Sequence, residues 1–211
     1  MKISEIFTSI QGETSFVGLQ FTFVRLTGCN LRCSYCDTQY AYEEGTEYSL
    51  DTVVAEVNKR AVPRVVITGG EPLLQDETCI LCSRLLDAGV TVLLETNGSI
   101  LIKDVDQRVH RILDMKCPGS GMDKYMNLQN IDYLTVRDEI KFVISDRKDF
   151  EWALEILKQH EMQGRAHVLF SPVSDRLHPQ ELAEWILQEK LNVRLQLQIH
   201  RYIWPDRRRG V

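Results

Sequence analysis

Short apolar runs of β character alternate with helical segments along most of this 211-residue chain, and this alternation restricts the possible fold more than any other feature. Repeated strand and helix segments are typical of βα units on a mainly parallel sheet. A glycine after a helical run, such as Gly89, marks where that helix ends. The expected strands cover residues 21–26, 64–68, 91–95, 111–115, 139–144, 167–170 and 193–199, and the expected helices cover residues 50–59, 73–88, 150–161 and 179–188.

About six core strands are too few for a closed eight-stranded (β/α) barrel. The length of the chain fits one domain better than two small ones. The sequence therefore predicts an α/β fold in which residues 1–211 form a single domain, a partial TIM-like (β/α) barrel of about six mainly parallel strands. The stretch from Cys117 to Asp138 is the least assignable part.

Composition and charge exclude several functional classes. Hydrophobic residues at 44% and charged residues at 26% are ordinary for a globular protein. A net charge of -5 does not indicate direct nucleic-acid binding, and the basic run Arg207–Arg209 is expected to be solvated. Because neither a membrane span nor the apolar core of a signal peptide is recognisable, we expect a cytoplasmic protein without a membrane partner.

Three of the six cysteines form a C-x3-C-x2-C run directly after the first expected strand. In a reducing compartment, clustered thiols indicate a metal site rather than a disulfide framework. Structural zinc normally takes four protein ligands, whereas a 4Fe-4S cluster on Cys29, Cys33 and Cys36 keeps one iron open for another ligand. The run therefore predicts a cluster that takes part in chemistry.

Cys79 and Cys82 allow an alternative, a four-thiolate zinc site shared with Cys33 and Cys36. The gap between the two pairs is much longer than in a zinc ribbon, and Cys79 and Cys82 lie in a helical run. Since a buried free cysteine packs as a small hydrophobic residue, we expect this pair in the core. The role of Cys117, before Pro118, stays open.

Two motifs together resemble the radical S-adenosylmethionine (SAM) superfamily: the cysteine run, and Gly69-Gly70-Glu71-Pro72 after the second strand. Two glycines there let the backbone approach a ligand closely, at the end of the sheet where α/β proteins bind ligands. The resemblance implies that SAM binds the open iron and is cleaved to a 5′-deoxyadenosyl radical. Glu71 is expected to accept a hydrogen bond from the SAM ammonium group.

Further patches resemble the 7-carboxy-7-deazaguanine synthase family. These patches are Glu5 to Glu13, Phe23-Val24-Arg25, Cys36-Asp37-Thr38, Glu95-Thr96-Asn97-Gly98 and Gln198 to Pro205. The resemblance implies a radical ring contraction of 6-carboxy-5,6,7,8-tetrahydropterin to 7-carboxy-7-deazaguanine, a lyase step of queuosine biosynthesis that releases ammonia. It also implies Mg2+, a flavodoxin-like or other low-potential electron donor, and a homodimer.

Matching positions assign the site residues. Thr38 would offer Mg2+ a hard oxygen, and Arg25 would hold the substrate carboxylate in its guanidinium fork. The positions expected to contact the substrate are Ile10, Gln11, Gly12, Glu13, Arg25, Thr68 and Pro205. The positions expected to contact SAM are Tyr35, Cys36, Asp37, Gly70, Glu71, Glu95, Asp114, Met115, Lys116 and Ser171.

Simpler roles stay open for Thr38 and Ser171 as loop or turn hydroxyls, and for Arg25 as a rim salt bridge. Thr14 stands where many relatives have glycine, and because threonine disfavours positive φ it puts the local loop conformation in question. Residues 206–211 extend beyond the position matching the family's end, so a terminal-carboxylate role is not carried over. Among the histidines, His200 is the one expected nearest the site.

Two other functions remain alternatives. One is a radical SAM activating enzyme that installs a glycyl radical on a partner protein, which a large exposed partner-binding patch would favour. The other is a non-catalytic zinc-binding or interaction module, which would depend on Cys79 and Cys82. The patches around Gln11 and Glu95 favour the small-molecule enzyme.

Overall fold

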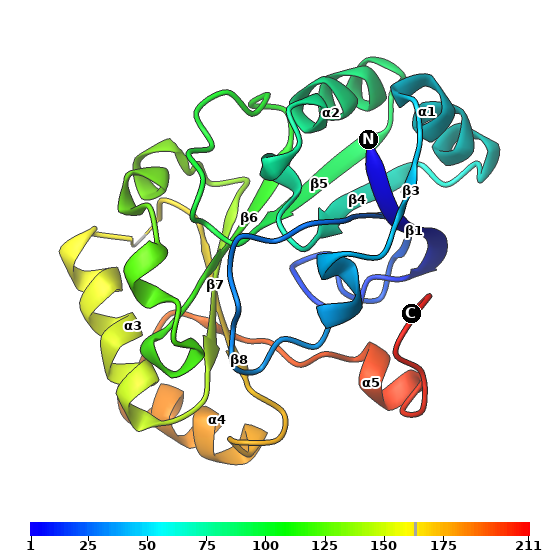
Figure 1. Ribbon diagram of the computed structural model, residues 1–211. Coiled ribbons are helices and arrows are strands. Elements are labelled where there is room, and N and C mark those ends of the chain that lie inside the picture. The colour runs from blue at the N-terminus through cyan, green and yellow to red at the C-terminus, as the bar shows by residue number, and fades with distance from the viewer. Residues whose placement is uncertain (163) are drawn as a thin grey trace.

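A computed structural model describes residues 1–162 and 164–211 of the protein. Its centre is one nine-stranded sheet in the order β3-β1-β2-β4-β5-β6-β7-β8-β9 (Figure 1). The strands are β1 Lys2–Ile10, β2 Gln20–Leu26, β3 Thr46–Glu47, β4 Arg64–Gly69, β5 Thr91–Thr96, β6 His110–Met115, β7 Glu139–Ile144, β8 His167–Pro172 and β9 Arg194–Leu195.

Every pairing from β2 through β4 to β9 is parallel, and β1 and β3 add an antiparallel edge. Among the described residues the edge strands β3 and β9 do not pair with each other, so the barrel stays open. This confirms the predicted partial barrel, with six parallel strands of six or seven residues and a two-residue seventh.

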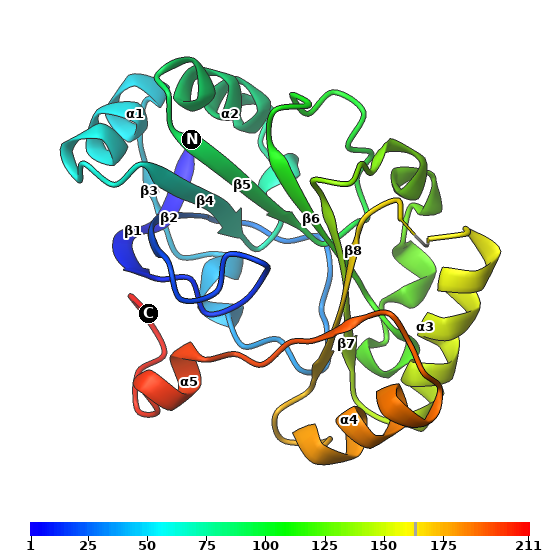
Figure 2. The ribbon, with the colours of Figure 1, turned by 180° about the vertical axis from the view of Figure 1, so that it is seen from behind.

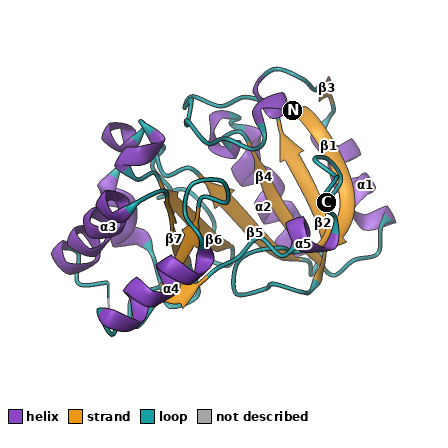
Figure 3. Cartoon of the chain, turned by 90° about the horizontal axis from the view of Figure 1, so that it is seen from below, coloured by secondary structure: helices purple, strands orange, loops and turns teal. Residues whose placement is uncertain are grey.

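Helices cover the outer face of the sheet (Figures 1 and 3). They are α1 Leu50–Lys59, α2 Glu77–Asp87, α3 Arg147–Gln159 and α4 Pro179–Gln188, and a short α5, His200–Ile203, lies apart from them near β1 and β2 (Figure 2). Local signals fix their ends: Ser49 caps α1 by accepting from the Thr52 amide, and Gly89, at φ 81°, follows the end of α2 as predicted. None of the helices in the described ranges has the length and apolar character needed to cross a bilayer.

Strand alternation divides the apolar side chains into two cores. Outward residues such as Val24, Ile67 and Leu94 pack against the helices in the larger core. Inward residues form a smaller core inside the barrel, made of Phe21, Phe23, Val66, Leu93 and Ile112.

Several elements differ from the sequence expectation: the short β3 and α5 were not expected, and α3 begins at Arg147 rather than at Phe150. β1 is a strand that the apolar-run criterion missed, because only Ile3 and Ser9 of Lys2–Ile10 are buried. α2 begins at Glu77 rather than Leu73, after a 3₁₀ turn over Pro72–Leu74. β9 covers only two residues of the expected strand 193–199, because after Gln196 the chain leaves the sheet and crosses toward β1.

Candidate active site

A polar layer lies above the inner apolar core, at the carboxyl end of the parallel strands. Because side chains alternate, the last inward apolar residue of a strand is followed two positions later by an inward polar one, as Phe23 is by Arg25 and Leu93 by Glu95. The polar residues at these inward strand positions are Arg25, Thr68, Glu95, Asp114, Lys141 and Ser171. Ligand sites of such sheets lie at this end of the strands.

The Gly69–Gly70 pair packs directly against the start of the cysteine loop. A Cβ on Gly70 would collide with the Gly28 carbonyl oxygen and lie 2.7 Å from Cys29 Cβ. Gly69 has φ 145°, a conformation that favours glycine, and the Glu71 amide donates to the Gly28 carbonyl at 2.8 Å. The two glycines thus let β4 hold the cysteine loop at close range.

Glu71 is fully buried, and its carboxylate points into the protein. It accepts from the Thr96 hydroxyl at 2.8 Å and from the backbone amides of Leu73 at 3.0 Å and Asn97 at 2.6 Å. These donors lower the pKa of Glu71, but burial outweighs them and its pKa lies above its ordinary value. The carboxylate expected to receive the SAM ammonium is therefore already used to join the ends of β4 and β5.

A chain of alternating charges crosses the polar layer. Lys141 Nζ lies 2.9 Å from Glu13 Oε2 and 3.2 Å from Asp114 Oδ2, and Lys116 Nζ lies 3.0 Å from the same Asp114 oxygen. Burial alone would raise the pKa values of Glu13 and Asp114, but the lysine ammonium groups outweigh it and both pKa values lie below normal. Both acids are therefore ionised at neutral pH.

One oxygen of this chain is left over. Asp114 Oδ1 is buried and has no hydrogen-bond partner among the described residues. A buried acceptor without a donor is costly, so this oxygen is suited to a donor from a bound ligand. Met115, by contrast, is buried in the outer core, so only its backbone remains available to SAM.

Three of the predicted contact residues, Glu95, Thr68 and Gln11, are joined by hydrogen bonds. Its Oε2 accepts from the Thr68 hydroxyl at 2.9 Å, and its Oε1 accepts from Gln11 Nε2 at 3.4 Å. Burial and the nearby Glu13 raise the pKa of Glu95, although Lys141 and Arg25 act against them. Glu95 was expected to contact SAM, but both of its hydrogen-bond partners, Gln11 and Thr68, were expected to contact the substrate.

Arg25 forms one ion pair on the inner wall. Its Nε donates to Glu5 Oε1 at 2.7 Å. Neither Nη group donates to any residue within the described ranges, so the outer edge of the guanidinium stays available. Arg25 is therefore suited to the predicted contact with the substrate carboxylate. It also makes a salt bridge, with Glu5, as in the alternative role.

The loop between β1 and β2 fills the open barrel from the side of the inner core. Phe16 packs edge-to-face on Phe21, and Ser15 donates to Glu139 at the start of β7. Thr14 takes φ 67°, so the loop keeps the left-handed conformation despite the threonine, and its Oγ1 accepts from the Phe16 amide at 3.1 Å. The loop thereby brings Gln11 and Glu13 to the polar layer.

The segment after β9 closes over this loop. The Ile199 amide donates to the Gly12 carbonyl at 3.0 Å, and a Cβ on Gly12 would collide with the His200 ring. Gln198 Nε2 lies 2.7 Å from Glu13 Oε1 and 3.4 Å from Asp37 Oδ2. His200 therefore does lie at the predicted substrate loop.

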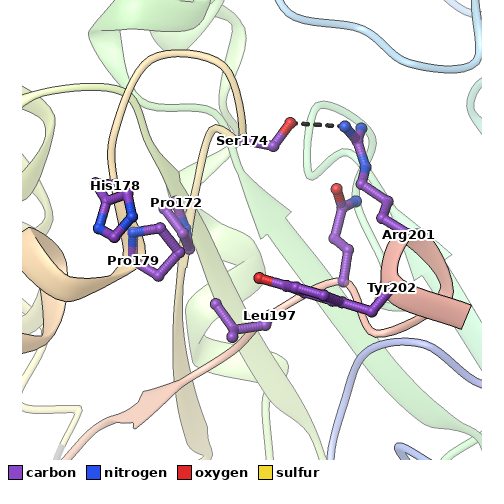
Figure 4. Close-up of a pocket in the computed structure, with 8 residues that line it drawn as sticks. Pro172, Ser174, His178, Pro179, Leu197, Arg201 and Tyr202 are labelled. Atoms are coloured by element: carbon purple, nitrogen blue, oxygen red, sulfur yellow. Dashed lines mark hydrogen bonds between the residues drawn. The ribbon is translucent and has the colours of Figure 1, made fainter. Parts of the chain in front are cut away.

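A cavity of about 320 Å³ lies between this segment and the end of β8 (Figure 4). Arg201 spans it, donating to the Ser174 hydroxyl at 2.6 Å and pairing with the half-exposed Asp37 at 3.2 Å. Pro205 lies beyond α5 and is exposed, and within the described ranges no hydrogen bond joins it to the other predicted substrate residues. The segment thus joins the cysteine loop, the β1–β2 loop and β8.

Comparisons with known proteins identify the family. Residues 23–186 match the model of the radical SAM superfamily. A 7-carboxy-7-deazaguanine synthase of Koribacter versatilis is 45% identical, with 100% of both chains covered, and one of Chlorobaculum tepidum is 45% identical, with 100% of this chain and 97% of the relative covered. The protein belongs to the 7-carboxy-7-deazaguanine synthase family. The crystal structure of QueE from Escherichia coli has the same fold, with a TM-score of 0.78 at 24% identity over 93% of each chain.

As a radical SAM protein, this family member uses a 4Fe-4S cluster and SAM. Its cysteine loop fits the cluster. Cys29, Cys33 and Cys36 are free and half-buried, and the Leu31 amide and Asn97 Nδ2 point toward Cys29 Sγ at 3.4 and 3.8 Å. Such donors to sulfur are a known feature of cluster-binding thiolates.

The other three cysteines of this 7-carboxy-7-deazaguanine synthase family member pack in the outer core. Cys82 and Cys117 are fully buried there, and Cys79 packs against the same core. No group of three His, Cys, Asp or Glu side chains suited to a single metal ion occurs in residues 1–162 and 164–211. The expected packing of Cys79 and Cys82 is confirmed, and Cys117 has the same role.

Three residues of the site were not expected from the sequence of this 7-carboxy-7-deazaguanine synthase family member: Lys141, Glu5 and Tyr40. The signal for Lys141 was present, because a lysine in the middle of a buried strand must have a partner. Glu5 and Tyr40 had no such signal, since the contact of Glu5 with Arg25 depends on the pairing of β1 with β2, and Tyr40 donates to Glu5.

Proposed function

We propose that the protein is a 7-carboxy-7-deazaguanine synthase, a carbon-nitrogen lyase that contracts 6-carboxy-5,6,7,8-tetrahydropterin to 7-carboxy-7-deazaguanine and releases ammonia. The observation that carries this proposal is the polar layer itself. A guanidinium with a free edge, a half-buried carboxylate and a buried amide converge there, on Arg25, Glu95 and Gln11, in a chain that matches synthases along its whole length.

The polar layer complements both ends of this substrate. Arg25 binds the substrate carboxylate, because a guanidinium edge can donate two parallel hydrogen bonds to it. The amino and ring N–H groups of the pterin need acceptors, which Glu13 and Glu95 supply. Ile10, Gly12 and Thr68 form the adjacent wall, and Pro205 lies outside it in this arrangement.

The residues that would hold SAM lie in the other half of the layer, toward the cysteine loop. Together with the cluster SAM supplies the radical chemistry when both are bound. The unpartnered Asp114 Oδ1 accepts from the SAM ammonium, and Lys116 keeps Asp114 ionised. The other residues that would contact SAM are Gly70, Tyr35, Cys36, Asp37 and Ser171. Met115 would contribute its backbone alone, because its side chain is in the outer core. Glu71 would support the cysteine loop through its contacts with Gly28, Thr96 and Asn97 rather than contact SAM.

Thr38 is a ligand of Mg2+ at the edge of the site. It precedes the 3₁₀ helix Gln39–Tyr42, but its hydroxyl does not cap that helix, and its side-chain contact is Cys36 Sγ at 3.8 Å. One protein hydroxyl is sufficient for Mg2+, which keeps several waters and binds substrate oxygens. Residues 1–211 carry the whole activity as a single domain of a cytoplasmic homodimer that receives electrons from a flavodoxin-like donor.

Paired cysteine variants test this function. The anaerobically reconstituted protein, given reductant, SAM and Mg2+, is expected to consume 6-carboxytetrahydropterin. Cys33→Ala is expected to lose the cluster and the turnover, whereas the matched control Cys79→Ala keeps both. Turnover by Cys33→Ala would overturn the proposal, and dependence on Cys79 would support the zinc module instead.

A further inference from the structure

Residues 206–211 fold back toward β1 and the segment from Tyr40 to Glu44 (Figure 2). Arg209 Nη2 lies 2.6 Å from Glu44 Oε2, and its guanidinium carbon lies 4.1 Å from the centre of the Tyr40 ring. The Gly210 amide donates to Glu5 Oε2 at 3.2 Å. The basic run was expected to be solvated, and Arg209 is exposed at 54% while it makes these contacts.

The contact with Glu5 links this segment to Arg25. One carboxylate oxygen of Glu5 accepts from Arg25 Nε at 2.7 Å and from the Tyr40 hydroxyl at 2.8 Å, and the other accepts from Gly210. The side chains of Arg25 and Glu5 are only 12% and 17% exposed. Hydrogen bonds between charged groups are strong in such surroundings, so Glu5 fixes the Arg25 side chain.

A β-bulge places Glu5 on the correct face. The register of β1 against β2 shifts between Ile3, which pairs with Leu26, and Glu5, which pairs with Arg25. If the register of Ile3 and Leu26 continued without a bulge, Ser4 would pair with Arg25, and Glu5 would pair with Val24 and point to the outer core, because a one-residue slip reverses the face. The bulge therefore serves the Glu5–Arg25 contact.

Glu5 holds the guanidinium by Nε and leaves the two Nη groups for a ligand. Two-point binding of a carboxylate requires the plane of the fork to be fixed. Glu5 fixes that plane, and Tyr40 and Gly210 in turn fix Glu5.

We propose that Glu5, Tyr40, Arg209 and Gly210 form a latch that positions the Arg25 guanidinium for the substrate carboxylate. The proposal rests on the proposed function and deepens it: the latch makes the protein select carboxylated pterins over pterins that lack the 6-carboxylate. Glu5, Tyr40 and Arg209 are positioning residues, which act through Arg25.

The test compares two stable ligands on the SAM-loaded holoenzyme, 6-carboxypterin and pterin, by anaerobic calorimetry. A variant that ends at Arg208 removes Arg209 and Gly210. We expect it to bind 6-carboxypterin about fivefold more weakly and pterin unchanged, since an exposed ion pair and a cation-π contact are modest effects. Tyr40→Phe is expected to shift the same ratio in the same direction, and Arg207→Ala, on the neighbouring exposed residue, to leave both affinities unchanged.

The outcomes separate the latch from the proposed function. If the variant ending at Arg208 keeps the wild-type preference for 6-carboxypterin, or weakens both ligands equally, the latch is overturned. If the wild-type protein has no such preference, the carboxylate role of Arg25 and the latch fail together. A wild-type protein that shows the preference and loses it on truncation, yet does not turn over 6-carboxytetrahydropterin, would refute the reaction while the latch stands.

Discussion

Glu95 carries a half-buried carboxylate that has hydrogen bonds from Thr68 and Gln11 but no direct ion pair within the described ranges. Burial and the neighbouring Glu13 raise its pKa, against Lys141 and Arg25. A carboxyl group whose pKa is raised on folding stabilises the fold below its unfolded pKa, and this contribution is lost as the pH rises through the folded pKa. At neutral pH the ionised Glu95 therefore lowers the free energy of unfolding of the protein. Its position beside Thr68 and Gln11 suits ligand binding.

The Glu95→Gln variant separates these two effects. Because the amide removes the half-buried charge, we expect the variant to have a higher thermal midpoint than the wild type at pH 8. The gain should shrink as the pH falls toward 5. We also expect kcat/KM for the pterin to fall by about tenfold to a hundredfold, as for loss of a hydrogen bond to a charged group. Calorimetry across this pH range checks the stability; a gain that grows toward acid pH would contradict the account.

The Lys141→Met variant tests the chain of charges. It leaves Glu13 and Asp114 buried with one cation fewer, and removing one partner of a buried pair costs about 3 kcal/mol or more. The free energy of unfolding in urea should fall by about that amount. Lys148→Met, on an exposed lysine of α3, is the matched control and should change stability by less than about 0.5 kcal/mol. Equal losses in the two variants would show that Lys141 is not specifically paired.

The same variant should alter acid stability. Glu13 and Asp114 have pKa values lowered on folding, so their contribution is present above the unfolded pKa and is lost as the pH falls through the folded pKa. Without Lys141 both folded pKa values rise. The difference in stability between wild type and variant should therefore be largest near neutral pH and should narrow below about pH 4.

At the scale of elements, the end of β4 determines where the cysteine loop lies. Its two glycines contact the backbone from Leu26 to Cys29, and Glu71 is tied to β5 through Thr96 and Asn97. A side chain on Gly70 meets backbone that cannot rotate away. The position of the loop, and with it the cluster, therefore depends on the absence of that side chain.

We expect Gly70→Ala to displace the cysteine loop and to lower the iron bound per chain by at least half after reconstitution. Gly89→Ala is the control, because Gly89 has a positive φ but an added Cβ meets nothing within 4 Å. That variant should lose about 1 kcal/mol of stability and retain full iron content. Normal iron content in Gly70→Ala would show that the close approach is not needed.

The elements that could be predicted are those whose residues carry a local signal. Strands β4 to β8 are apolar runs, and the cysteine and glycine motifs identify the cluster loop. β1 was missed because only Ile3 and Ser9 of this strand are buried, so it has no apolar run. The orientation of the Glu71 carboxylate depends on the hydrogen bonds that Thr96 and Asn97 donate at the end of β5, and no local sequence pattern around Glu71 indicates these donors.

At the scale of the whole molecule, an open sheet is closed by two irregular segments rather than by strands. The β1–β2 loop fills the barrel, and the segment after β9 crosses from β8 to that loop (Figures 1 and 2). Within the segment after β9, Gln198 contacts both the β1–β2 loop and the cysteine loop, because its amide reaches Glu13 and Asp37. The two segments therefore enclose the site together.

The Gln198→Ala variant should loosen this closure. We expect faster amide hydrogen exchange at residues 196–204 and a KM for the pterin raised by about threefold to tenfold, as for loss of hydrogen bonds to carboxylates. Gln188→Ala, at the exposed end of α4, is the control and should change neither. Unchanged exchange at residues 196–204 would contradict a closing role for Gln198.

The most direct measurement for the whole account is the product balance of the anaerobic reaction. Reconstituted protein, reductant, SAM, Mg2+ and 6-carboxy-5,6,7,8-tetrahydropterin are incubated, and 7-carboxy-7-deazaguanine is determined by mass and ammonia by enzymatic assay. The account predicts the two products in equal amounts over many turnovers. Formation of 5′-deoxyadenosine without 7-carboxy-7-deazaguanine, from a protein with an intact cluster, would contradict the assigned substrate.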